Sequence, residues 1–205
     1  MDASQRLSRL ARARLYLVLD GRAGGVLEAA LRGGVDIVQL RDKELPDDEL
    51  VAAAEPFRSA CDRHGALFVL NDRPDLVEVC GADGVHVGQT DTPVAEARAA
   101  VGADRLIGLS IETEEQLDAI DGADYLGVGA VFATPTKTEA VAAGLDLVRA
   151  AAERVHIPWF AIGGIELDTA GEVIAAGAPG IAVVRAIRDA DDPEVAARTL
   201  KHLFA

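Results

Sequence analysis

The chain has 205 residues, 50% of them hydrophobic and 26% charged, and its 34 acidic against 20 basic residues give a formal net charge of -14. This composition supports one compact core and excludes disordered, collagen-like and disulfide-rich proteins. The acidic balance excludes a broad nucleic-acid or anionic-membrane footprint, which needs clustered Lys and Arg, so we expect no nucleic acid and no membrane as partners.

Predicted strands and helices alternate along the chain. Residues 1–14 are Arg-rich and predict an N-terminal arm or short helix. Apolar runs predict eight buried strands, at residues 15–20, 36–41, 66–71, 84–88, 105–111, 125–132, 158–165 and 180–187. The segments between and after them predict helices at residues 45–65, 92–102, 113–123, 146–155, 168–178 and 193–204. Near-continuous apolar strands alternating with helices are typical of a parallel sheet covered by helices.

We therefore predict an α/β fold, a single-domain (β/α)8 TIM barrel of near-minimal length over residues 1–205. A weak repeat supports closure, because a similar tetrapeptide precedes each even-numbered strand: GGVD at 33–36, GADG at 81–84, GADY at 122–125 and GAPG at 177–180. Four such quarters make eight strand and helix units. A doubly wound open sheet is the alternative, and eight strands in one domain make it less favourable.

The cysteines and the hydropathy pattern indicate in which cellular compartment the protein is expected. Cys61 and Cys80 show neither CxxC nor zinc spacing, and we interpret them as small apolar side chains in a reducing compartment. No run of about 18 apolar residues predicts a membrane helix. The expected location is cytoplasmic.

In a barrel of this kind the chemistry lies where the strands end at their C-termini. The second strand ends with Gln39, Arg41 and Lys43. Period-two alternation would point these three side chains to the same face, where together they would form an anion-binding fork. The alternative is a strand end that frays into solvent.

Acidic residues follow the third and fourth strands. The third ends at Asn71 and Asp72, and Asp91 follows the fourth. Neighbouring strands would bring the two carboxylates within reach of one cation, as in magnesium sites completed by substrate phosphates. Each Asp also stands two residues before a proline, so each could instead cap a helix.

The remaining strand ends carry candidate ligand groups. Ser110 ends the fifth strand, with Thr113 as a separate candidate helix cap. The loop after the sixth strand carries Thr134, Thr136 and Lys137, and residues 134–144 are our candidate for a mobile lid.

The seventh and eighth strands end near the common phosphate site of this architecture. Gly163 and Gly164 follow the seventh strand, and Val184 and Arg185 lie in the eighth. A lone pair of glycines could also serve only to ease strand packing.

Taken in order, QLRDK, LNDRPDL, DGVHVGQTD, GLS, GVGAVFATPTK, AIGGI and VVRAI resemble the thiamine phosphate synthase family from about residue 15 to 190. The resemblance implies a transferase that couples 4-amino-5-hydroxymethyl-2-methylpyrimidine diphosphate to 4-methyl-5-(2-phosphoethyl)thiazole, with Mg²⁺ as cofactor and small phosphorylated molecules as partners. It implies catalytic roles for Arg41, Lys43, Ser110 and Lys137. The implied pyrimidine diphosphate residues are Gln39, Arg41, Lys43, Asn71, Ser110 and Lys137. The implied magnesium ligands are Asp72 and Asp91, and the implied thiazole phosphate residues are Thr134, Thr136, Gly164, Val184 and Arg185.

One position departs from the family pattern, since many members carry Ser where this chain has Arg185. A contact through the backbone amide would tolerate Arg, whereas a contact through the Ser hydroxyl would remove this residue from the site. The implied coupling needs neither a general base nor a covalent nucleophile from the protein, because the attacking thiazole nitrogen has a free lone pair and diphosphate is a good leaving group. We accordingly interpret the four histidines as structural or surface residues.

Two other functions stay open at this stage. A related barrel that isomerises the thiazole phosphate would need no diphosphate clamp, so Asp72, Asp91 and Lys137 argue against it. The second is a non-catalytic barrel that binds thiamine precursors and regulates partners. It would not need all the polar residues named above, so their presence argues against it.

Overall fold

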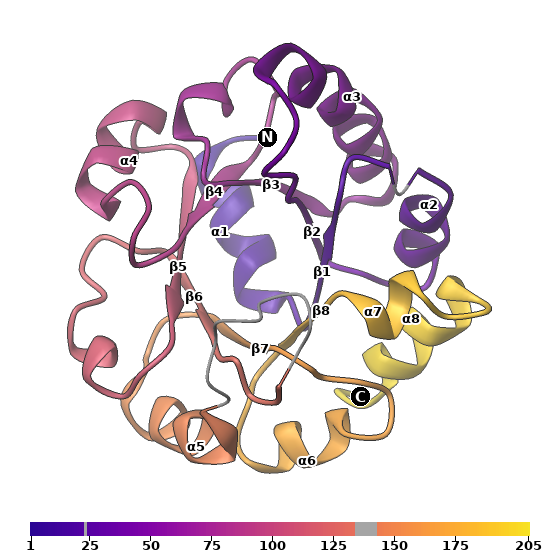
Figure 1. The fold of residues 1–205 in the computed structure, drawn as a ribbon, viewed down its shortest axis with the longest axis vertical. Helices are drawn as coiled ribbons and strands as arrows, with labels where there is room; N and C mark the ends of the chain where they lie inside the picture. The colour runs from indigo at the N-terminus through magenta and orange to yellow at the C-terminus, as the bar shows by residue number, and fades with distance from the viewer. Residues whose placement is uncertain (23, 134–142) are drawn as a thin grey trace.

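The computed structural model describes residues 1–22, 24–133 and 143–205, and its strands form one closed parallel barrel (Figure 1). Each strand pairs with the next, and β8 returns to β1 with Ile181 opposite Leu15. This last pairing excludes the open sheet and confirms the predicted TIM barrel. The strands are β1 Leu15–Leu19, β2 Ile37–Leu40, β3 Leu67–Asn71, β4 Gly84–Val87, β5 Leu106–Ile111, β6 Tyr125–Val128, β7 Trp159–Ile162 and β8 Ile181–Val183.

Helical segments surround the strands in Figure 1. They are α2 Gly24–Arg32, α3 Asp47–His64, α4 Val94–Val101, α5 Gly144–Arg154, α6 Ala170–Ala175, α7 Arg185–Arg188 and α8 Pro193–His202, with single 3-10 turns η1 Pro74–Leu76 and η2 Glu115–Asp118. In the described part of the chain, no helix is both long enough and apolar enough to cross a membrane.

Three helical segments differ from the sequence predictions. The predicted helix 113–123 is only the short η2, because Gln116 Oε1 accepts the backbone N–H groups of Glu112 at 2.6 Å and Thr113 at 3.2 Å and closes a tight turn. Helix α2 was not among the predicted helices. The predicted strand 180–187 stops at Val183, so Arg185 begins helix α7 and does not extend a strand.

Two apolar layers hold the barrel together. The larger lies between the strands and the outer helices, and includes both free cysteines. The smaller fills the barrel interior with inward side chains of alternate strand positions, among them Tyr16, Tyr125 and Phe160. Side chains that fill the interior leave a packed core, so a ligand can enter only at an end of the barrel.

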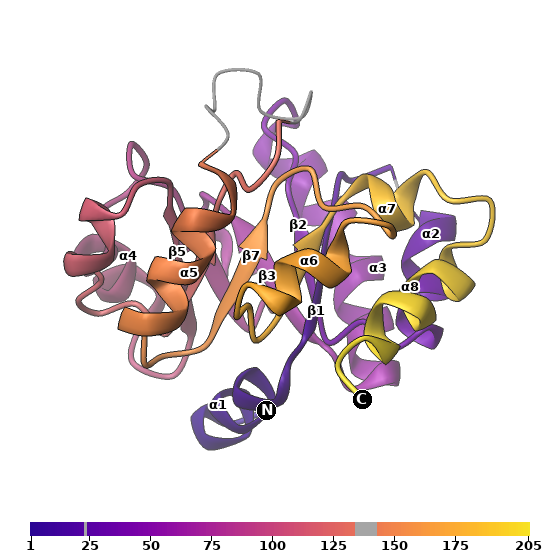
Figure 2. The ribbon, with the colours of Figure 1, turned by 90° about the horizontal axis from the view of Figure 1, so that it is seen from below.

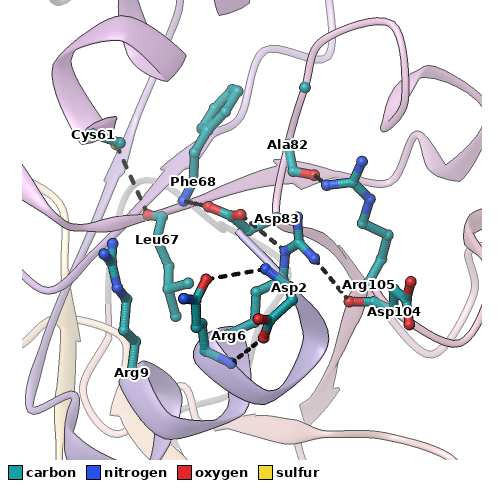
Figure 3. Close-up of polar contacts among 12 residues, drawn as sticks. Asp2, Arg6, Arg9, Cys61, Leu67, Phe68, Ala82, Asp83, Asp104 and Arg105 are labelled. Carbon is teal, nitrogen blue, oxygen red and sulfur yellow. Dashed lines mark hydrogen bonds and ion pairs between the residues drawn. The ribbon is translucent and has the colours of Figure 1, made fainter. Parts of the chain in front are cut away.

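Helix α1 (Ala3–Arg12) lies at the end of the barrel where the strands begin, below the strands in Figure 2. Its Leu10 packs into the interior layer. Figure 3 shows Arg6 reaching from α1 to Asp83, with Nε 3.0 Å from Oδ1 and side-chain exposures of 7% and 2%. Asp83 Oδ2 also accepts the Phe68 N–H at 3.0 Å and pairs with Arg58 at 2.8 Å. The site must therefore lie at the opposite end, which α1 leaves open.

The predicted repeat is visible as a turn before each even-numbered strand. Its glycines, Gly34, Gly81, Gly122 and Gly177, all have positive φ, between 64° and 110°. Only glycine adopts this backbone region at no steric cost. The glycine therefore recurs in each repeat because the turn before the strand requires it.

Candidate active site

A cavity of about 560 Å³ opens at the C-terminal ends of the strands. Every predicted site residue that the structure describes lines it: Gln39, Arg41, Lys43, Asn71, Asp72, Asp91, Ser110, Gly164, Val184 and Arg185. The predicted residues Thr134, Thr136 and Lys137, with most of the predicted lid 134–144, lie outside the described residues.

The three donors after the second strand lie at different depths. Gln39 is 4% exposed, and its Nε2 donates to Tyr16 Oη at 2.7 Å inside the barrel. Strand β2 ends at Leu40, so Arg41 and Lys43 follow the strand and the expected alternation does not reach them. Among the described residues, no side chain pairs with the Arg41 guanidinium, whereas Lys43 Nζ lies 2.8 Å from Asp72 Oδ2.

Asp72 and Asp91 form an acidic pair at the mouth. Burial raises the pKa of Asp72, and the adjacent Asp91 carboxylate raises it further, while Lys43 opposes both effects. Asp91 Oδ2 accepts the Gly88 N–H at 2.9 Å, and helix α4 begins after Pro93 with no side-chain cap, so the helix-cap alternative for Asp91 is wrong. Adjacent carboxylates are the oxygen donors that a hard divalent cation takes.

The described residues contain no group of three or more His, Cys, Asp and Glu side chains placed to hold a metal ion. A cation between Asp72 and Asp91 would therefore complete its shell with substrate oxygens and water, which is how Mg²⁺ is usually bound beside phosphates.

Ser110 faces His86, one of the four histidines interpreted from the sequence as structural or surface residues. His86 Nε2 lies 3.0 Å from Ser110 Oγ, and His86 Nδ1 lies 3.3 Å from Tyr125 Oη. The Ser110 carbonyl accepts Gln89 Nε2 at 2.6 Å. A serine and histidine pair is thus present, and the Tyr125 phenol lies on His86 Nδ1, the ring nitrogen that contacts a carboxylate in the arrangement that activates a serine nucleophile.

The two glycines after β7 are required by close packing. A Cβ on Gly163 would lie 2.6 Å from Ala130 Cα, and one on Gly164 would lie 2.7 Å from Phe132 Cβ. Both residues also have positive φ, of 103° and 65°. Larger residues here would push the loop after β7 away from the segment that follows β6.

Arg185 is paired across this side of the mouth. Its Nη2 lies 2.8 Å from Glu166 Oε1, with side-chain exposures of 34% and 37%. Glu166 was not predicted as a site residue, although it follows β7 by only a few positions. Its carboxylate pairs the guanidinium of Arg185 with the loop that also carries Gly164.

Several cavity residues were missed by the sequence analysis: Tyr16, Asp20, His86, Gln89, Glu112 and Glu166. Asp20 and Gln89 stand just past a strand end, so the rule that located Asp72 could have found them. His86 pairs in register with Asn71 on β3 and Gly108 on β5, which places it on the inward face.

Comparison with known proteins adds independent findings. A family model described as thiamine monophosphate synthase matches residues 15–187. A Thermobifida fusca protein named thiamine-phosphate synthase is 52% identical, over 98% of this chain and 96% of its own length. A Thermosynechococcus vestitus protein of the same name is 47% identical over 95% of this chain, which spans 57% of that longer relative. The solved thiamine phosphate pyrophosphorylase from Pyrococcus furiosus superposes with a TM-score of 0.88 at 34% identity, covering 95% of this chain and 96% of that one.

Proposed function

The chain belongs to the thiamine monophosphate synthase family. We propose that the residues lining the cavity bind the pyrimidine diphosphate and the thiazole phosphate and promote their coupling. The observation that carries the proposal is the convergence in one cavity of an acidic pair, the Arg41 guanidinium, with which no described side chain pairs, and the glycine loop after β7. These groups suit two different phosphorylated substrates bound side by side.

The bond changes need little from protein side chains. The lone pair of the thiazole nitrogen forms the new bond to the pyrimidine methylene carbon, and the carbon to oxygen bond breaks with its electron pair passing to the diphosphate. The products are thiamine phosphate and diphosphate, and no proton must be moved. The protein must orient the two rings and stabilise the charge that develops on the leaving diphosphate.

Arg41 and Lys43 suit the diphosphate. Because no side chain in the described part of the chain pairs with the Arg41 guanidinium, it can donate two parallel hydrogen bonds to phosphate oxygens. Lys43 lies beside Asp72 and can shift between that carboxylate and the diphosphate. Lys137, outside the described residues, completes the cationic set in this proposal.

Asp72 and Asp91 would hold Mg²⁺ in this scheme. When bound, Mg²⁺ would supply positive charge to neutralise the departing diphosphate. The two carboxylates bring the negative charge that such a cation needs, and they lie next to each other at the mouth of the cavity.

The thiazole phosphate is placed on the opposite side of the mouth, at Gly164, Val184 and Arg185, with Thr134 and Thr136 from outside the described residues. Its phosphate would accept from backbone N–H groups of this loop and approach the guanidinium that Glu166 holds. We place the enzyme in the cytoplasm, where its free thiols Cys61 and Cys80 would stay reduced.

The test is turnover with both substrates and Mg²⁺. We expect thiamine phosphate and diphosphate in equal amounts, and no product when either substrate is omitted. Conversion of the thiazole phosphate alone would instead indicate an isomerase. Binding of both substrates without product would indicate a non-catalytic barrel.

A further inference from the structure

A continuous chain of hydrogen bonds crosses the interior of the barrel at the floor of the cavity. Gln39 Nε2 donates to Tyr16 Oη at 2.7 Å, and Tyr16 Oη lies 3.0 Å from Tyr125 Oη. Tyr125 Oη lies 3.3 Å from His86 Nδ1, and His86 Nε2 lies 3.0 Å from Ser110 Oγ. The two ends belong to the proposed pyrimidine diphosphate site, whereas the three middle residues have no role in it so far. We refer to these five side chains as the interior chain.

The surrounding packing holds the interior chain in place. The rings of Tyr16 and Tyr125 both stand edge-on to Phe160, at centroid distances of 5.4 and 6.1 Å. A Cβ on Gly108 would lie 2.4 Å from His86 Nδ1 and 2.5 Å from Tyr125 Oη. Glycine at position 108 therefore leaves the space in which the phenol and the imidazole meet.

The order of donors gives the interior chain a direction. Burial raises the pKa of Tyr16 and of Tyr125 far above neutral pH, so each phenol keeps its one proton. Tyr16 accepts from Gln39, so its own proton goes to Tyr125, and the proton of Tyr125 goes to His86 Nδ1. The proton of a neutral His86 is then on Nε2 and points at Ser110 Oγ. The Ser110 hydroxyl, already an acceptor, is left to donate outward into the cavity.

We propose that the interior chain is a positioning device that fixes the Ser110 hydroxyl as a hydrogen-bond donor to the bound pyrimidine diphosphate, with Tyr125 and His86 as positioning residues. No proton is transferred along it, because each side chain keeps its own proton throughout. The proposal rests on the proposed function, which supplies the identity of the ligand.

The kinetic test removes one oxygen from the middle of the chain. Tyr125→Phe should raise the KM for the pyrimidine diphosphate about tenfold, the scale of one hydrogen bond, and leave the KM for the thiazole phosphate within about twofold. In a Ser110→Ala background, Tyr125→Phe should have no further effect, because the chain acts through that hydroxyl. Equal losses in both backgrounds would overturn the proposal, as would wild-type constants in Tyr125→Phe. Tyr16→Phe breaks the preceding link and should reproduce the pattern if Tyr125→Phe fails to fold.

A spectroscopic test needs no substrate. The ¹⁵N chemical shifts of the His86 ring in the full-length protein should show a protonated Nε2 and an unprotonated Nδ1 at pH 8, and Tyr125→Phe should weaken this preference. A protonated Nδ1 would reverse the direction of the chain and overturn the proposal. Absence of synthase turnover in the wild type would count against the proposed function alone, since the tautomer is measured independently.

Discussion

Asp72 is the one non-glycine residue with positive φ, at 59°, among the residues the structure describes. Asp tolerates this backbone region better than most residues, but it still costs free energy that the surrounding contacts must offset. The Asp72 N–H donates to the His86 carbonyl at 2.8 Å, and its carboxylate contacts Lys43. These contacts turn the carboxylate toward Asp91, which is consistent with a cation site assembled from two strand ends.

Replacement of Asp91 by Asn tests the acidic pair. We expect Asp91→Asn to lower kcat by about a hundredfold or more and to raise the Mg²⁺ concentration needed for half-maximal rate, because one anionic ligand is lost. The melting temperature should change little, since an Asn oxygen can still accept the Gly88 N–H that Asp91 now accepts at 2.9 Å. Wild-type turnover at low Mg²⁺ in this variant would contradict the assignment.

Replacement of Arg185 by Ser tests the position that departs from the family pattern. Because Arg185 and Glu166 are both about one-third exposed, we expect the KM for the thiazole phosphate to rise less than about tenfold, with kcat unchanged. Part of this rise in KM comes from the Glu166 carboxylate, which loses its cation and then repels the thiazole phosphate. Adding Glu166→Gln to Arg185→Ser should therefore recover affinity for the thiazole phosphate. Arg41→Ala is the matched control and should raise only the KM for the pyrimidine diphosphate. A hundredfold fall in kcat for Arg185→Ser would place this guanidinium on the leaving group.

Among the elements, apolar runs located the strands because β1, β2, β6 and β8 are buried at every position and the other strands at every position but one. The same pattern misled at residues 180–187, where apolar residues continue past Val183 into helix α7. Burial alone does not distinguish a short strand from a short buried helix. The helical period of residues 113–123 also misled, because the Gln116 side chain bonds backbone N–H groups locally in place of a longer helix.

Helix α1 is attached to the barrel by a buried ion pair, and this gives a stability prediction. Arg6→Ala leaves Asp83 with one cation fewer and should lower the free energy of unfolding by about 3 kcal/mol. For a chain of this length the melting temperature should fall by roughly 6 to 12 °C. Substrate KM values should stay unchanged, because the pair lies at the end of the barrel opposite the cavity. Arg12→Ala, exposed on the same helix, is the control, and an equal loss there would contradict the role of Arg6.

At the scale of the whole molecule, the sequence indicated which strand ends carry polar groups but not how inward side chains meet. The contact of His86 with Ser110 depends on the register of β4 against β5, in which His86 is opposite Gly108. No local pattern encodes that register, since it is set by closure of the barrel. The alignment of strand ends is, by contrast, a property of the fold, so residues just past those ends, such as Asp72, could be found from the sequence.

The quarter repeat shows how closure is secured. Asp36, Asp83 and Asp124 each donate a backbone N–H to the preceding strand at the carbonyls of Leu15, Phe68 and Ile107. Their carboxylates accept the N–H groups of these same three residues. The fourth quarter has Pro179, which lacks both groups, and there Ala161 N–H bonds the Gly180 carbonyl at 3.0 Å. Three of the four quarters are thus joined by a two-way Asp contact.

Burial ranks these three Asp contacts and gives a prediction for the whole barrel. The Asp83 side chain is 2% exposed and pairs with two Arg residues, whereas Asp124 and Asp36 are 23% and 27% exposed. Asp83→Ala should therefore cost about 4 kcal/mol, because it removes the carboxylate that pairs with the buried Arg6 and leaves Arg58 with Asp62 alone, and Asp36→Ala and Asp124→Ala should cost about 2 kcal/mol each. Urea unfolding should remain one transition with an unchanged slope, since a closed sheet cannot lose one quarter alone.

The control is Asp121→Ala, an exposed residue beside the Asp124 contact, which should change the free energy of unfolding by less than about 0.5 kcal/mol. Equal losses at all three positions, or a second transition, would show that the quarters are not joined in this way.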